Sequence, residues 1–219
     1  MKKRIMLLMV LTAAVLAGCS GKAGAADQTT SSSAAETAAE ETKTDAGTAG
    51  ETAEAVNHHV KINVKDYGTI SVELDPTYAP ITVENFLSLA ESGFYDGLTF
   101  HRIIDGFMIQ GGDPLGTGLG GSDTTIKGEF SRNGVENPLS HTRGAISMAR
   151  SQDKDSASSQ FFIVHQDSPH LDGDYAVFGY VTDGMDVVDK ICEDTKVTDR
   201  NGTVAKENQP VIESVEVVD

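Results

Sequence analysis

Residues 100–113 read FHRIIDGFMIQGGD, the most informative stretch of the chain. Within nine residues it holds a guanidinium, two large apolar side chains and a carboxamide, from Arg102, Phe107, Met108 and Gln110. Two later blocks are also rich in aromatic residues, SQFFI at 159–163 and HLDGDYAVFG at 170–179. A Phe-rich segment taken singly belongs to a core more often than to a pocket, so a functional interpretation rests on the three blocks together.

These blocks resemble the cyclophilins in content, order and spacing. The resemblance covers about residues 60–218 and includes the segment with Pro80, Asn85 and Phe86. It implies a mainly β fold, a closed eight-stranded antiparallel barrel capped by two helices, with a proline groove on its outer surface. It also implies peptidyl-prolyl cis/trans isomerase activity on proline-containing polypeptides, without a cofactor or metal.

Carried over position by position, the resemblance implies one catalytic residue and a substrate groove. Arg102 corresponds to the catalytic arginine, which donates a hydrogen bond to the prolyl nitrogen as the amide twists. The expected walls of the proline pocket are Phe107, Met108, Phe162 and Leu171. The residues expected along the peptide are Gln110, Ala149, Arg150 and Gln160, with Ala149 and Arg150 offering backbone groups.

Three positions of the expected groove depart from the best-known family pattern. His170 stands where many cyclophilins carry a tryptophan, so binding of the cyclosporin drug class does not follow from the resemblance. Tyr175 replaces a pocket histidine but keeps a ring with a polar tip, so we expect catalysis to continue. Arg150 replaces a common asparagine at a contact made mainly through the backbone. We count His170 and Tyr175 among the substrate-binding residues.

Hydrophobic periodicity independently predicts a strand-rich domain. The segments VKINV and TISVEL alternate apolar and polar residues around residues 66–68, which is typical of a β-hairpin. In the segment 80–93, apolar residues recur at helical spacing between a proline start and a glycine stop. Further strands are expected in GAISMA, SQFFIV, YAVFGYV and PVIESVEVV, and a short helix around 185–192. Many strands and few helices favour an antiparallel barrel over a βαβ architecture.

The first residues are typical of a bacterial lipoprotein signal peptide, predicted over 1–18. A basic patch at 2–4 and an apolar run over 5–15 precede Leu-Ala-Gly-Cys, in which Cys19 would be acylated. The alternatives are an ordinary secretory signal cleaved nearby or an uncleaved anchor, and both also take the chain out of the cytoplasm. We therefore expect an extracytoplasmic protein that is lipid-anchored to the bacterial cell membrane.

Residues 19–56 form the predicted tether, and residues 57–219 the isomerase domain. The tether consists of Ala, Thr, Ser, Gly and acidic residues with almost no large apolar side chains, so it cannot offset the entropy of ordering. The net charge of −16 disfavours nucleic acid as a partner. Two cysteines are too few for a disulfide framework or a four-cysteine metal site. The domain is expected to be a monomer.

Two other features have simpler explanations. GTGLGG at 116–121 matches the glycine pattern of dinucleotide-binding folds, but QGGDP precedes it, the polar run SDTTIKGEF follows and no amphipathic helix begins there, which favours a flexible glycine loop. Asn201-Gly202-Thr203 matches a glycosylation sequon but is interpreted as a turn.

The functional alternatives to the enzyme are a proline-segment binding module or holdase with little turnover, and a purely structural surface lipoprotein.

Overall fold

The computed structural model describes residues 56–219. The predicted signal peptide, Cys19 and all of the predicted tether except Val56 lie outside these residues. Within residues 56–219, no helix is both long and apolar enough to cross a membrane. Cys192 is buried and makes no disulfide within this part of the chain.

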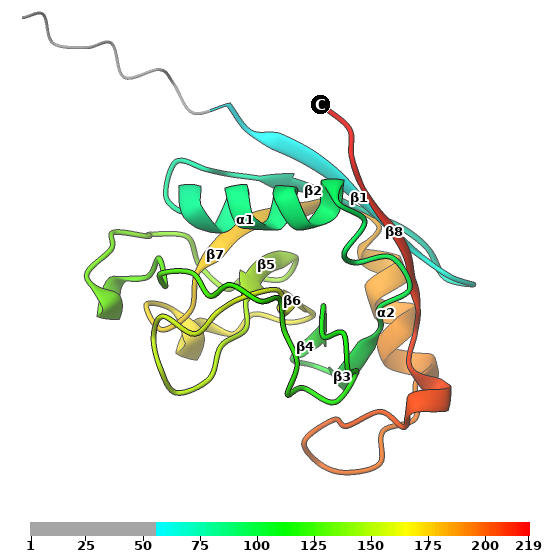
Figure 1. Ribbon diagram of the computed structural model, residues 1–219. Helices are drawn as coiled ribbons and strands as arrows, with labels where there is room; N and C mark the ends of the chain where they lie inside the picture. The colour runs from blue at the N-terminus through cyan, green and yellow to red at the C-terminus, as the bar shows by residue number, and fades with distance from the viewer. Residues whose placement is uncertain (1–55) are drawn as a thin grey trace, which may run out of the picture. The chain divides into compact units, whose positions relative to one another are not determined.

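Eight antiparallel strands form one curled sheet in the order β3-β4-β6-β5-β7-β2-β1-β8 (Figure 1). The strands are β1 His58–Val64, β2 Gly68–Leu74, β3 Phe100–Ile104, β4 Met108–Gly111, β5 Ala145–Met148, β6 Phe161–Val164, β7 Val177–Asp183 and β8 Ile212–Val217. The expected hairpin is confirmed as β1 and β2, which pair from Val64 with Gly68 to His58 with Leu74. The mainly β, antiparallel fold class is confirmed.

The sheet closes less completely than the expected barrel, because β3 and β8 do not pair as strands. Instead, the first residue of each of these strands bonds to the segment that precedes the other strand. The Phe100 N–H donates to the Pro210 carbonyl at 2.9 Å, and the Ile212 N–H donates to the Leu98 carbonyl at 2.8 Å. The fold is therefore a curled half-barrel of strands whose edges meet through short flanking segments.

Both predicted α-helices are present, α1 at Pro80–Glu91 and α2 at Met185–Asp194 (Figure 1). Pro80 occupies the first turn of α1, where its missing N–H costs nothing. The buried Glu129 carboxylate accepts hydrogen bonds from the backbone N–H groups of Ile81 and Thr82, at 3.1 and 2.7 Å. This carboxylate satisfies the free N–H groups that begin the helix.

Helix α1 covers the core with its apolar face, where Val83, Phe86 and Ala90 are buried. The Phe86 ring lies 5.4 Å from the ring of Phe161 in β6 and 5.3 Å from that of Phe178 in β7. Since the residues of a strand alternate between its two faces, Phe161 faces this core while Phe162 faces the other side of the sheet. The same strand thus supplies the core and the site described next.

Candidate active site

Arg102 lies within β3 and faces Gln110, its partner in the antiparallel pairing with β4. The Arg102 Nε donates to the Asn201 carbonyl at 2.8 Å, and Nη1 donates to Gln110 Oε1 at 3.2 Å. Within residues 56–219, Nη2 makes no hydrogen bond. The guanidinium is thus fixed from two sides and keeps donors free for a ligand.

Burial sets the electrostatics of this arginine. Desolvation lowers the pKa of Arg102, while Tyr175 and Asp199 oppose that effect. An arginine side chain stays protonated in proteins at any ordinary pH, so the site contains a permanent, half-buried positive charge. Electrostatic interactions are stronger here than in bulk water because the surroundings are less polarisable.

An apolar pocket of about 140 Å³ opens beside Arg102. Met108 and Phe162 are buried at its base, while Leu171 and Tyr175 close it from the segment before β7. The rings of Phe162 and Tyr175 meet nearly at right angles, with centroids 6.0 Å apart. The lining residues are Arg102, Phe107, Met108, Gln110, Ala149, Arg150, Phe162, Leu171 and Tyr175, all of them predicted from the sequence.

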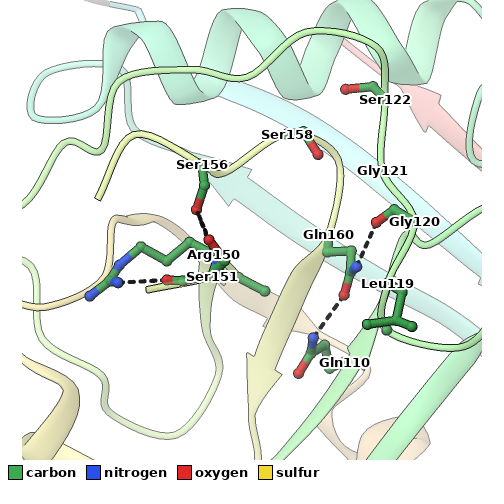
Figure 2. A pocket seen from close by; sticks show the side chains of 12 residues that line it. Gln110, Leu119, Gly120, Gly121, Ser122, Arg150, Ser151, Ser156, Ser158 and Gln160 are labelled. Atoms are coloured by element: carbon green, nitrogen blue, oxygen red, sulfur yellow. Dashed lines mark hydrogen bonds between the residues drawn. The ribbon is translucent and has the colours of Figure 1, made fainter. Parts of the chain in front are cut away.

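A second, more polar cavity of about 320 Å³ adjoins this pocket and shares Gln110, Ala149 and Arg150 with it. Two of the hydrogen bonds drawn in Figure 2 join residues that line this second cavity. Gln110 Nε2 donates to Gln160 Oε1 at 2.9 Å, and Gln160 Nε2 donates to the Gly120 carbonyl at 2.7 Å. Arg102, Gln110 and Gln160 therefore form one chain of hydrogen bonds across β3, β4 and the start of β6. The predicted residue Gln160 lines this second cavity.

The residues that build this cleft lie within a stretch of sequence that matches one family model. Residues 59–217 match the model for cyclophilin type peptidyl-prolyl cis-trans isomerases. The chain belongs to the cyclophilin family. Its enzyme class is therefore peptidyl-prolyl cis-trans isomerase.

Relatives and solved structures support the same family. Peptidyl-prolyl cis-trans isomerase B of Bacillus subtilis is 49% identical over 144 residues, 66% of this chain and 92% of that protein. A Helicobacter pylori peptidyl-prolyl cis-trans isomerase is 50% identical over 57% of this chain and 74% of its own length. A cyclophilin type isomerase of Cryptosporidium parvum has a similar structure, with TM-score 0.66, 31% identity, and coverage of 75% of this chain and 99% of its own.

The structure of this cyclophilin defines the surroundings of Ala149 and Arg150, the two residues expected to offer backbone groups to the peptide. The Ala149 N–H donates to the Gln160 carbonyl at 2.9 Å, so the backbone group of Ala149 that remains for a peptide is its carbonyl. The Arg150 side chain turns back into the protein, where Nη2 donates to the Asp174 carbonyl at 2.8 Å. Its guanidinium carbon lies 4.7 Å from the Tyr175 ring centroid. Arg150 therefore holds Tyr175 in place.

His170 does not line either cavity of this cyclophilin. Its ring lies outside the pocket against Phe107, with centroids 5.6 Å apart and planes 33° apart. A contact between His170 and a substrate stays a prediction, whereas its contact with Phe107 is direct.

Sequence reasoning missed three residues that support the site. Asn201, interpreted only as part of a turn, holds Arg102 through its backbone carbonyl. His141 is buried behind the pocket and stacks on Phe162 at 5.9 Å. Asp113 accepts backbone N–H bonds from Leu115 at 2.8 Å and Thr117 at 2.9 Å. Only the last has a sequence signal, an aspartate before a glycine-rich turn.

The GTGLGG segment is confirmed as a loop of the cyclophilin, with no helix after it until the 3-10 turn at Ser131–Asn133. It differs from the expected flexible loop in its anchorage. The Asp113 carboxylate binds its first turn, and Gln160 binds the Gly120 carbonyl. The loop therefore forms a fixed wall of the second cavity, and the context for dinucleotide binding is absent from it.

Proposed function

We propose that this chain accelerates Xaa-Pro isomerisation in exported proteins, with Arg102 stabilising the twisted amide while the proline ring occupies the apolar pocket. The observation that carries the proposal is the position of Arg102, which borders the pocket and has Nη2 free of protein hydrogen bonds within residues 56–219. The solved Cryptosporidium parvum cyclophilin determined in the presence of the dipeptide Ala-Pro supports the class of ligand.

The chemistry requires stabilisation of one conformation. Amide resonance imposes a barrier of about 18–20 kcal/mol, and rotation by a quarter turn localises a lone pair on the prolyl nitrogen. Arg102 would donate a hydrogen bond to that lone pair, an interaction that the planar amide does not offer. The apolar pocket would hold the ring in place while the carbonyl side rotates. No nucleophile and no covalent intermediate are involved.

The alternative function is a binding module or holdase, in which the pocket captures proline segments and turnover is incidental. A cation placed beside the pocket favours the enzyme, because ring capture alone requires only the apolar walls. The test is NMR exchange spectroscopy on a short Xaa-Pro peptide with the purified protein and its Arg102→Ala variant. We expect the variant to lose about a hundredfold in the catalysed exchange rate. Equal rates for the two proteins would exclude the proposed mechanism.

We also propose that the protein is lipid-anchored through Cys19 outside the cytoplasm. The support is the order of basic residues, apolar run and Leu-Ala-Gly-Cys over residues 2–19, followed by a polar, acidic segment. Metabolic labelling with a fatty acid tests this proposal. We expect the label on the wild-type protein and none on Cys19→Ser, and a label retained by the variant would contradict acylation at this cysteine.

A further inference from the structure

His165 lies at the end of β6, behind the turn that connects β3 to β4, and is only 7% exposed. The Gly106 N–H donates to His165 Nδ1 at 2.9 Å. On the other side of the ring, Nε2 lies 3.0 Å from Asp189 Oδ1 in α2. The imidazole thus bridges the β3–β4 turn and α2.

These partners define one tautomer of His165. Nδ1 must carry a lone pair, because it accepts a hydrogen from a backbone N–H. The proton of the neutral ring therefore resides on Nε2, which donates it to the Asp189 carboxylate. A second proton on Nδ1 would place two N–H groups against each other at 2.9 Å, so protonation must break the bond from Gly106.

The Gly106 bond matters because Phe107, a wall of the apolar pocket, follows directly. Gly106 has a φ of +75°, a backbone conformation that glycine adopts without strain. The backbone N–H of His165 also donates to the Phe107 carbonyl at 2.8 Å. His165 therefore holds the residues on both sides of the Gly106–Phe107 peptide bond, one through its ring and one through its backbone.

The charged groups around the ring come from three elements. Asp105 Oδ1 in the turn lies 3.4 Å from Nδ1 and would accept a hydrogen bond from a proton added to that nitrogen. Arg143, which precedes β5, binds Asp189 at 2.8 Å and opposes a positive charge on the ring. The Cys192 thiol lies in the same cluster, and burial first, then nearby carboxylates, raise its pKa to about 12.

Asp105, His165 and Cys192 have ligand atoms within 4.8 Å of one another, a spacing that could suit a metal ion. The hydrogen bonds argue against that reading. Both ring nitrogens of His165 already have partners, and Cys192 is held as a neutral thiol, whereas a metal requires a free lone pair and a thiolate.

We propose that neutral His165 is a positioning residue for isomerisation, which keeps the Phe107 wall in place, and that protonation of Nδ1 releases Gly106 toward a looser turn. The positive ring then pairs with Asp105, so the site loses proline affinity as the pH falls. This inference rests on the proposed role of Phe107 in holding the proline ring.

The first test follows the Gly106 amide and the His165 ring signals of the purified protein by NMR as the pH is lowered from neutral. We expect the amide proton shift to titrate together with the His165 ring signals. Gly134 is the matched control, because its N–H donates to the Ser131 carbonyl in an exposed turn at the same φ of +75°. A Gly106 shift that stays constant while His165 titrates would overturn the inference, whatever the isomerase mechanism.

The second test compares pH profiles of wild type, His165→Asn and His165→Phe by peptide exchange. Asn can accept from the Gly106 N–H but does not titrate, whereas Phe keeps a ring without an acceptor. We expect the wild-type KM to rise by about threefold or more once the ring signals report that His165 is protonated, with a smaller change in kcat. His165→Asn should retain activity at neutral pH and should not show the rise in KM at acid pH. His165→Phe should have a raised KM at every pH. A rise in KM at acid pH that persists in His165→Asn would overturn the inference.

Discussion

At the residue scale, the orientation of the Arg102 side chain is set by the groups that accept its hydrogen bonds. A free arginine side chain loses much rotamer entropy when it is fixed, and here the Asn201 carbonyl and Gln110 Oε1 fix it before any ligand arrives. Such preorganisation means that little of the binding energy is spent on ordering the proposed catalytic group. The second cavity takes part in this arrangement because Gln160 holds Gln110 in turn.

The Gln110→Ala variant tests this support. Arg102 Nη1 loses its acceptor Gln110 Oε1, so the Arg102 guanidinium samples several orientations. We expect the catalysed exchange rate to fall by about tenfold. Gln160→Ala removes only the more distant link and should lose less. Both rates are measured by the same peptide exchange experiment at saturating and limiting peptide. A Gln110→Ala rate equal to that of wild type would show that Arg102 needs no support from Gln110.

At the element scale, the strands and helices follow from local patterns, while the contacts between distant segments do not. The periodicity in residues 80–93 predicts α1, and the alternation in residues 60–74 predicts the first hairpin. The nine pocket residues could be named only because three blocks match a family together. Asn201 could not be found in this way, because it contacts Arg102 through its backbone carbonyl. Every residue has such a carbonyl, so the sequence carries no signal for this contact. The turn of the Arg150 side chain back toward Asp174 likewise depends on packing that no local pattern encodes.

The loop that carries Asn201 gives a prediction at this scale. Gly202 has a φ of +79°, and a Cβ there would lie 2.3 Å from the Ile103 carbonyl oxygen in β3. We expect Gly202→Ala to push the loop away from β3, to cost about 3 kcal/mol of stability and to slow isomerisation, because the Arg102 contact is displaced. Urea unfolding and peptide exchange measure the two effects.

Gly134→Ala is the matched control for Gly202→Ala. Gly134 has a similar φ of +75°, but a Cβ there meets no atom within 4 Å. It should cost about 1 kcal/mol for the backbone conformation alone and leave the exchange rate unchanged. Equal effects of the two substitutions on stability and rate would contradict a specific role for the close approach at Gly202.

At the scale of the whole molecule, buried histidines link stability to pH. Desolvation lowers the pKa of His141, although the nearby Asp172 carboxylate opposes the shift, and burial likewise lowers the pKa of His101. The unfolded chain therefore binds protons at a higher pH than the folded protein does. The contribution of these histidines to the free energy of unfolding should be fully present above the pKa of an unfolded histidine, about 6.5. It should be lost as the pH falls below that pKa.

The His141→Gln variant isolates one of these contributions. It removes the titrating ring behind Phe162, so the difference in unfolding free energy between neutral and acid pH should become smaller than in wild type. Urea titrations at several pH values between about 5 and 8 provide the comparison. An unchanged pH dependence in the variant would assign the acid sensitivity to other groups.

In the proposed mechanism, Arg102 acts on the twisted amide and not on the ground state. The most direct measurement determines, on one Xaa-Pro peptide by NMR, both the dissociation constant and the catalysed exchange rate for wild type and Arg102→Ala. We expect Arg102→Ala to lose about a hundredfold in the exchange rate, while its dissociation constant changes by less than about threefold. A parallel loss of affinity and exchange rate would contradict this mechanism, because Arg102 would then bind the planar and the twisted amide equally.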